Sequence, residues 1–292
     1  MKLVTFSARN DQADIGVGAL VDEGAAVLDF RRADLQMPRD MLACFDLDGS
    51  WLPRAIGLAA APPAKARIPV DAVRLRAPVP RPGKLVCVGL NYRDHAAESK
   101  MAVPERPVLF SKFTTAVIGP GEPIVIPSGS EKVDYEAELA IVIGRRAKRV
   151  SRDQAAAAIL GYTIVNDVSA RDFQFADGQW QRGKSCDTFA PMGPTIVTSD
   201  EAGDPQQLGI RLRVNGQTLQ SSNTNQMIFG AVDLVAYICE TITLEPGDVI
   251  ATGTPSGVGF ARKPPIFLKA GDQVEVELDG LGVLENPVRA EG

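Results

Sequence analysis

The chain has 292 residues, of which 45% are hydrophobic and 23% are charged, a balance that is typical of globular proteins and excludes long disordered or collagen-like tracts. Its net charge of -5 argues against nucleic acid as a partner, because duplex binding depends on Lys and Arg that neutralise phosphates. No apolar stretch approaches the roughly 20 residues that span a membrane, and the N-terminus lacks a secretory signal, so we expect a cytoplasmic protein.

The N-terminal part of the chain predicts a small β-rich domain. Alternating apolar and polar residues between Asp, Gly and Asn turns predict strands at residues 2–7, 16–21 and 25–30. Prolines are dense between residues 59 and 84, and this stretch cannot form a helix interior or a central strand. We therefore place the small domain at residues 1–76 and the main domain at residues 77–292.

The main domain alternates short β-rich runs with Gly and Pro turns. Strands are expected at residues 85–88, 107–110, 124–126, 139–143, 163–165, 195–197, 212–214, 249–252 and 274–278. Helices are few. The clearest covers residues 152–160, where Ser151 and Gln154 have capping-box spacing and Gly161 lies at the C-terminal cap, and a second covers residues 231–240. This pattern predicts a β-rich α+β domain.

Two glutamates begin the most apolar of these strands. Glu136 and Glu138 are two residues apart, and a strand repeats every two residues, so both point to the same face. The next strand ends in a third acid, Asp167. Carboxylates that lose hydration side by side need a cation or a shared proton. Oxygen ligands without His or Cys suit Mg²⁺, Mn²⁺ or Ca²⁺ rather than Zn²⁺.

A solvated edge strand is the alternative explanation of this acidic pair, and it is the common one for an isolated Glu-x-Glu. Two features count against it here. The strand continues as an unbroken apolar run, which predicts burial on both faces, and the neighbouring strand also ends in an acid. The residues alone leave the metal site and the solvated strand evenly balanced.

His95 is the only histidine, so any mechanism that needs an imidazole base near neutral pH must use it. Asn91 is placed to cap a short helix that presents His95 and Glu98 three residues apart on one face. A carboxylate at that spacing would hold the imidazole in one tautomer and increase its basicity. The alternative, which the sequence alone favours, is a surface histidine beside a chance glutamate.

Two polar loops have the composition to complete a site. Residues 179–189 surround Lys184 with polar groups, and this lysine would bring a positive charge to an enolate or a carboxylate. Residues 253–259 are rich in glycine, so their backbone N–H groups would bind an anionic oxygen. Solvated loops are the alternative for both. Defining motifs of serine hydrolases, zincins, P-loop and Rossmann proteins are absent.

Five blocks in this order resemble the fumarylacetoacetate hydrolase family. They are residues 89–98, 134–144, 166–172, 183–193 and 247–255, within a resemblance that covers residues 84–287. The resemblance implies a β-roll of mixed sheets with few helices, preceded here by the small N-terminal domain, and a homodimer. It also favours the metal site, because Glu136, Glu138 and Asp167 match the family's ligands to a divalent cation. Mg²⁺ is the first choice, with Mn²⁺ or Ca²⁺ as alternatives.

The resemblance implies roles for the other site residues. These are His95 and Glu98 for water activation on a lid segment, Lys184 beside the metal, Thr254 at the substrate carboxylate, and Arg171 and Gln174 in the ligand-facing block. The implied reaction is hydrolysis of a carbon–carbon bond in a 2,4-dioxo acid, with release of pyruvate. Residues 179–189 and 263–272 resemble bacterial members that act on dioxo-deoxy sugar acids.

Two alternatives to hydrolysis remain open. The same metal site would serve a decarboxylase or tautomerase of a 2-oxo acid such as oxaloacetate, and neither reaction needs an attacking water. A binding or structural protein on this scaffold is the second alternative. In each enzymatic case the expected partner is a small 2-oxo acid.

Overall fold

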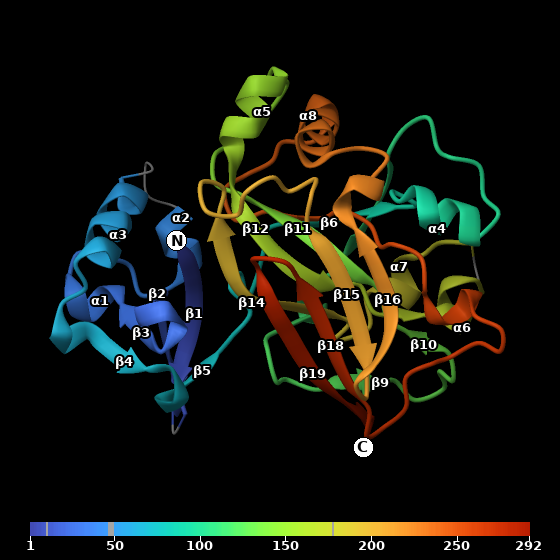
Figure 1. The fold of residues 1–292 in the computed structure, drawn as a ribbon, viewed down its shortest axis with the longest axis horizontal. Coiled ribbons are helices and arrows are strands. Elements are labelled where there is room, and N and C mark those ends of the chain that lie inside the picture. The colour runs from blue at the N-terminus through green and yellow to red at the C-terminus, as the bar shows by residue number, and fades with distance from the viewer. Residues whose placement is uncertain (10, 46–49, 177) are drawn as a thin grey trace.

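A long mixed sheet connects the N-terminal part of the chain with the rest (Figure 1). The computed structural model describes residues 1–9, 11–45, 50–176 and 178–292. In spatial order the strands are β4 (Arg67–Pro69), β3 (Ala26–Asp29), β2 (Asp11–Val21), β1 (Lys2–Ala8), β14 (Ala190–Thr198), β12 (Ile159–Asn166), β11 (Ala137–Ile143), β17 (Val249–Ala251), β6 (Leu85–Gly89) and β7 (Val108–Lys112). On its margins, β5 (Val73–Leu75) pairs with β1 and β8 (Val117–Ile118) pairs with β14.

A second sheet lies across the centre of the first (Figure 1). Its strands are β16 (Gln217–Asn223), β15 (Gly209–Val214), β18 (Gln273–Leu278), β19 (Gly282–Ala290) and β9 (Ile124–Ile126), and β10 (Val133–Asp134) pairs separately with β13 (Ser169–Ala170). Most pairs are antiparallel, while β17–β6, β14–β8 and β19–β9 are parallel. The expected β-rich roll of mixed sheets is confirmed. The sequence pattern missed the more polar strands β16 and β19.

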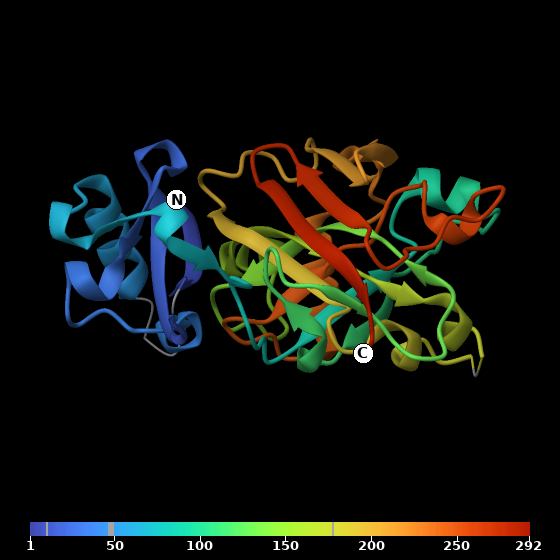
Figure 2. The ribbon, with the colours of Figure 1, turned by 90° about the horizontal axis from the view of Figure 1, so that it is seen from below.

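The N-terminal elements lie together at one end of the molecule (Figure 2). Besides the expected strands they include the helices α1 (Phe30–Ala33), α2 (Met41–Phe45) and α3 (Trp51–Ala60), which the sequence analysis did not predict. Strand β1 pairs with β14 through Leu3 and Ile196, so the main sheet continues into this region. The division at residue 77 stays a prediction.

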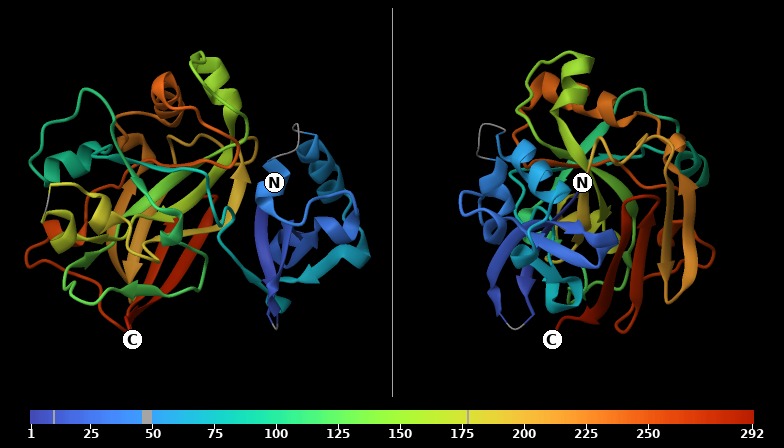
Figure 3. Two further views of the ribbon diagram at one scale, coloured as in Figure 1. Left: turned by 180° about the vertical axis from the view of Figure 1, so that it is seen from behind. Right: turned by 60° about the vertical axis from the view of Figure 1, so that its left-hand side comes forward.

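The remaining helices are short. They are α4 (Arg93–Glu98), α5 (Arg152–Ala158), α6 (Arg171–Gln174), α7 (Gln181–Lys184) and α8 (Ala231–Thr241). Single 3₁₀ turns are η1 (Asp22–Gly24), η2 (Ala64–Ala66), η3 (Val70–Ala72), η4 (Thr114–Ala116), η5 (Thr224–Gln226) and η6 (Gly259–Ala261). Helices α5 and α8 lie side by side at one edge of the fold (Figure 3). No helix in the described part of the chain is long and apolar enough to cross a membrane.

The start of α5 matches the prediction, but its end does not. Ser151 accepts a hydrogen bond from the Gln154 N–H at 3.3 Å, and the Gln154 side chain accepts one from the Ser151 N–H at 2.9 Å. The helix ends at Ala158, and Gly161 lies inside β12 rather than at a cap. A Cβ at Gly161 would lie 2.2 Å from the Val197 carbonyl oxygen. This glycine therefore permits the close approach of β14.

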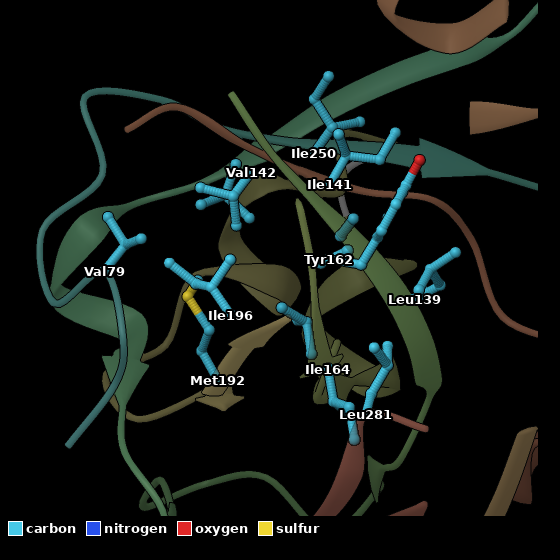
Figure 4. Packing of buried hydrophobic residues seen from close by; sticks show 14 of the residues in the cluster. Val79, Leu139, Ile141, Val142, Tyr162, Ile164, Met192, Ile196, Ile250 and Leu281 are labelled. Atoms are coloured by element: carbon cyan, nitrogen blue, oxygen red, sulfur yellow. The ribbon is translucent and has the colours of Figure 1, made fainter. Parts of the chain in front are cut away.

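The core is centred on β11 and β12, whose residues are all buried (Figure 4). Leu139 and Ile141 of β11 pair with Ile164 and Tyr162 of β12 across the antiparallel ladder. Burial on both faces explains the unbroken apolar run in the sequence. The core also fixes the point where β11 begins and β12 ends, and the acidic residues of the candidate site lie there.

Candidate active site

Three carboxylates converge where β11 begins and β12 ends. Ala137 pairs with Asn166 in the ladder, so the residues that flank this pair, Glu136 and Asp167, are neighbours, and the Asp167 N–H donates to the Glu136 carbonyl at 2.9 Å. Side-chain oxygens of Glu136, Glu138 and Asp167 all lie within 4.8 Å of one another, and all three residues are buried. The structure thus brings together the three acids that the sequence singles out.

Buried cations surround this acidic triad. Lys184 Nζ lies 2.7 Å from Glu136 Oε2 and 2.8 Å from Asp167 Oδ2. Arg171 Nη2 lies 2.6 Å from Glu136 Oε1. Lys112, which the sequence analysis missed, pairs with Asp167 and donates to the Val168 carbonyl at 2.9 Å. Glu136 and Asp167 therefore have cationic partners on more than one side.

Glu138 differs from the other two acids, because it makes no ion pair with a described residue. It accepts a hydrogen bond from the Gly253 N–H at 2.9 Å. Burial, followed by the charges of Asp167 and Glu136, raises the pKa of Glu138 well above its ordinary value. Burial also acts to raise the pKa of Glu136, but Lys184 and Arg171 outweigh it and hold that pKa at about 2.

The cluster fits a divalent cation by charge and by ligand type. Its carboxylates are Asp134, Glu136, Glu138 and Asp167, and its cations are Lys112, Arg171 and Lys184, all buried. One negative charge is therefore in excess, and it needs a proton or a cation. Oxygen ligands about 2.0–2.6 Å from a hard cation lie within about 5 Å of each other, which matches the spacing of the triad. Mg²⁺, Mn²⁺ and Ca²⁺ all suit this donor set.

Asp134 is a second residue that the sequence analysis missed. Its carboxylate accepts hydrogen bonds from Arg171 Nε at 2.9 Å and from the N–H groups of Gly259 at 2.7 Å and Phe260 at 3.1 Å. It thereby orients Arg171 toward Glu136 and ties the loop after β17 to the site. Nothing in the local sequence distinguishes Asp134 from an ordinary turn residue.

The glycine-rich loop does not present its N–H groups as expected. The Gly253, Gly257 and Gly259 N–H groups donate to Glu138, Glu98 and Asp134, respectively. The prediction that this loop forms a backbone cradle for an anionic ligand is therefore wrong at these three groups. Its function in the structure is to hold the protein's own carboxylates in place.

His95 and Glu98 meet on α4 as the spacing predicts. His95 is buried, and its Nδ1 lies 3.4 Å from Glu98 Oε2. The Gly257 N–H donates to both Glu98 oxygens, at 3.1 and 3.0 Å. Burial acts to raise the pKa of Glu98, but the bonds from His95 and Gly257 outweigh it and lower the pKa. Glu98 is thus an ionised acceptor for the imidazole at neutral pH.

Asn91 does not cap α4, so that prediction is wrong. Tyr92 occupies the N-cap position and makes no side-chain cap bond. The Asn91 amide instead donates to the carbonyls of Phe229 at 3.0 Å and Thr252 at 2.8 Å. These bonds join the segment before α4 to the β17 loop, from which Gly257 reaches Glu98.

A cavity of about 480 Å³ lies over the triad and is lined by every predicted site residue except Asp167. Its lining includes residues of α4, α6 and α7. These helices lie at the end of the molecule away from the N-terminal elements (Figure 1). Gln174 accepts a hydrogen bond from Arg171 Nη1 at 2.9 Å, and Thr254 Oγ1 accepts one from Gln220 Nε2 at 2.8 Å. A larger cavity of about 780 Å³ follows β6 and β7, but none of the three triad acids lines it. The smaller cavity is therefore the candidate site.

Comparison with known proteins is consistent across sequence and structure. Residues 84–289 match the family model described as fumarylacetoacetate (FAA) hydrolase C-terminal. The chain is 44% identical, over 99% of its length and 91% of the relative, to the mitochondrial oxaloacetate tautomerase Fahd2a of Rattus norvegicus.

Solved structures that match over the full length of the chain include a hydrolase and an isomerase. The fumarylacetoacetate hydrolase of the psychrophilic Exiguobacterium antarcticum is 36% identical with a TM-score of 0.84, and the alignment covers 100% of both chains. The 5-carboxymethyl-2-hydroxymuconate delta-isomerase of Mycobacterium smegmatis is 38% identical with a TM-score of 0.78, again over 100% of both chains.

Glu136→Gln and Glu138→Gln should change the stability of the metal-free protein in opposite directions. Glu136→Gln removes one of the two buried carboxylate partners of Lys184 and one of the two of Arg171, and breaking a buried ion pair typically costs about 3–5 kcal/mol. Glu138→Gln removes the surplus charge, so the free energy of unfolding should be unchanged or higher. A carboxyl group whose pKa is raised on folding loses stabilising effect as pH rises, so the advantage of Glu138→Gln over the native protein should grow above pH 4.5. Urea unfolding in chelator measures both effects.

The same variants should lose the stabilisation that added Mg²⁺ or Mn²⁺ gives to the native protein, because each lacks one triad oxygen ligand. Glu277→Gln is the control, because Glu277 lies in β18, pairs with Arg211 at 3.5 Å and is not part of the triad, so this variant should keep that stabilisation. A full metal-induced increase in stability in Glu138→Gln would show that this residue is not a ligand.

Proposed function

The chain belongs to the fumarylacetoacetate hydrolase family, and from this premise we propose that it is a divalent-metal-dependent tautomerase that interconverts the keto and enol forms of a small 2-oxo acid. The observation that carries the proposal is one cavity whose lining brings together Glu136 and Glu138 of the buried acidic triad, the His95–Glu98 pair and Lys184. The relatives described as an oxaloacetate tautomerase and as a delta-isomerase support proton transfer as the reaction type.

A divalent cation bound by the triad would polarise the 2-oxo group and make the adjacent C–H more acidic. Lys184 supplies a fixed positive charge beside the same oxygen. Burial acts to lower the pKa of Lys184, but Asp167 and Glu136 outweigh it and raise that pKa above the ordinary value. The ammonium group therefore stays protonated and stabilises the enolate oxygen rather than acting as a base.

His95 is the base that remains in the cavity. The contact between Nδ1 and Glu98 favours the tautomer with the proton on Nδ1, which leaves Nε2 free to accept a proton. In the proposed reaction, Nε2 removes the C3 proton of the keto acid, and the protonated His95 then gives this proton to the enolate oxygen to form the enol. Glu98 holds the imidazole in position and stabilises its charged form.

Hydrolysis of a carbon–carbon bond in a 2,4-dioxo acid is the second candidate. The specific observation in its favour is the same His95–Glu98 pair, because an oriented imidazole also suits the activation of water. An acylpyruvate or a dioxo-deoxy sugar acid would be the substrate and pyruvate a product. The expected likeness to bacterial enzymes of sugar acids stays a prediction. Decarboxylation of oxaloacetate is distinguished from both by release of CO₂.

Exhaustive chelation should abolish enzymatic interconversion of enol and keto oxaloacetate, and Mg²⁺ or Mn²⁺ should restore it. The enol form absorbs in the ultraviolet, so mixing experiments follow its disappearance directly, with the uncatalysed rate in chelator as the control. Full activity after chelation would contradict the proposal. Pyruvate released from acetylpyruvate, measured by a coupled dehydrogenase assay, would favour the hydrolase instead.

His95→Ala should lower kcat for tautomerisation by about 10²–10⁴, because general base catalysis is worth that much. Metal-dependent binding of oxalate, measured by calorimetry, should persist because His95 is not part of the triad. Glu98→Gln should reduce kcat less and shift the pH profile, since it removes the ionised acceptor at Nδ1. A fully active His95→Ala variant would exclude His95 as the base.

We propose that the enzyme acts as a homodimer, as the family resemblance implies. The cytoplasmic location stays a prediction, since the rat relative is described as mitochondrial.

A further inference from the structure

Gln220 is a buried glutamine of β16 that connects the acidic triad with Thr254. Its side-chain oxygen Oε1 accepts a hydrogen bond from the Ala137 N–H at 2.9 Å. Its nitrogen Nε2 donates to Thr254 Oγ1 at 2.8 Å and to the Pro255 carbonyl at 3.0 Å. Ala137 is the residue between the two triad glutamates. One amide group thus contacts both the strand that carries these acids and the loop after β17.

A β-bulge directs Gln220 into the protein. Gln220 pairs with Leu212 of β15, and the next pair joins Thr218 to Arg213. Leu219 is therefore an extra residue of β16, and it is buried together with Gln220. Neighbours in a regular strand point to opposite faces, whereas a bulge re-aims a side chain. The bulge thus allows this glutamine to reach the loop after β17.

The backbone partners of Gln220 fix which end of its amide group faces Thr254. The Ala137 N–H can only donate, so the side-chain oxygen must face it. The Pro255 carbonyl can only accept, so the side-chain nitrogen must face that group. The second hydrogen of this nitrogen then points at Thr254 Oγ1. A reversed amide group would break both bonds to the backbone.

The hydroxyl hydrogen of Thr254 has no acceptor among the described residues. A hydroxyl group has one hydrogen to donate, and the bond from Gln220 uses a lone pair of the oxygen rather than this hydrogen. Thr254 is 4% exposed and lines the cavity over the triad. A buried donor without an acceptor is unfavourable, so an acceptor atom of a ligand in the cavity would stabilise it.

We propose that Gln220 is a positioning residue that keeps the Thr254 hydroxyl as a hydrogen-bond donor toward the ligand. The site then favours an anionic oxygen of the 2-oxo acid at Thr254 and disfavours a ligand group that carries a hydrogen there. Gln220 acts through Thr254, because it is not among the residues that line the cavity. This inference rests on the proposed function, which supplies the anionic head group.

Gln220→Glu tests the inference with little change of shape. The new side chain offers Thr254 and Pro255 an oxygen with at most one hydrogen in place of a nitrogen with two. The Pro255 carbonyl can only accept, so the Thr254 hydroxyl should donate to the new oxygen instead of to the ligand. In the full chain loaded with Mg²⁺, calorimetry should show the Kd of oxalate raised by about 10-fold or more, the typical worth of a hydrogen bond to a charged group.

A double-mutant cycle with Thr254→Val separates positioning from a structural or charge effect. If Gln220 acts through the hydroxyl, Gln220→Glu should change the Kd of oxalate by about twofold or less in the Thr254→Val background. An equal rise of Kd in both backgrounds would overturn the inference, because added charge or a loosened fold does not need the hydroxyl. Thr254→Ser keeps the hydroxyl and should recover most of the affinity that Thr254→Val loses.

Gln206→Glu is the matched control. Gln206 is half-buried, and its amide also accepts from a backbone N–H, that of Ala231 at 3.0 Å, and donates to a carbonyl, that of Thr224 at 3.5 Å. It does not line the cavity, so this variant should keep the native Kd.

Thermal unfolding checks that each variant is folded. If Gln220→Glu is not folded, Gln220→Met takes its place in the same cycle. Methionine has no N–H to hold the Thr254 hydroxyl, so Kd should rise about threefold or more, and only where the hydroxyl is present.

The outcomes separate this inference from the proposed function. If oxalate binds the native chain and the Gln220 variants leave its Kd unchanged, the positioning role is wrong while the proposed function stands. If oxalate does not bind the Mg²⁺-loaded native chain, both proposals fail.

Discussion

One surplus negative charge, buried between β11 and β12, is the constraint on which the candidate site depends. Four carboxylates meet three cations there, and the charge left over lies at Glu138, which has no ion pair among the described residues. A buried charge without a partner is too costly to persist, so the group takes a proton or the cluster takes a cation. Ion pairs with Lys184 and Arg171 keep Glu136 ionised, so this carboxylate could bind a cation directly. Glu138, whose pKa is raised, would first have to release its proton. Binding of a cation by this site would therefore be coupled to the loss of a proton.

Backbone groups as well as side chains hold the buried carboxylates in place. The antiparallel register places Glu136 beside Asp167, and burial of both faces of β11 prevents water from separating them. The loop after β17 then directs three N–H groups at carboxylates of the site, including Glu98 on α4. The sequence analysis expected this loop to bind an anionic ligand, but in the structure it connects the acidic triad to the His95–Glu98 pair. The acid–base pair and the triad are thus held by one segment, which keeps their separation fixed.

The local sequence pattern predicts much of the fold and the acidic triad of the site. The features that it missed depend on contacts between residues that are far apart in the sequence. The period of a strand places Glu136 and Glu138 on one face, and the apolar run predicts the burial of β11. Lys112 carries no such pattern, because its partner Asp167 is 55 residues away and only the sheet brings them together. Asn91 similarly donates hydrogen bonds to residues 138 and 161 positions away, so the preference of Asn for helix N-caps was misleading here. Gly161 follows a helical run in the sequence, which suggested a helix cap. Glycine is needed there because β14 approaches closely, and the residues near Gly161 in the sequence give no sign of this contact.

Tautomerisation and carbon–carbon hydrolysis share their demand on this site, because both require an enolate oxygen to be stabilised beside Lys184. They differ in what His95 must reach. Proton transfer needs only a C–H bond near Nε2, whereas hydrolysis needs room for a water between Nε2 and the far carbonyl.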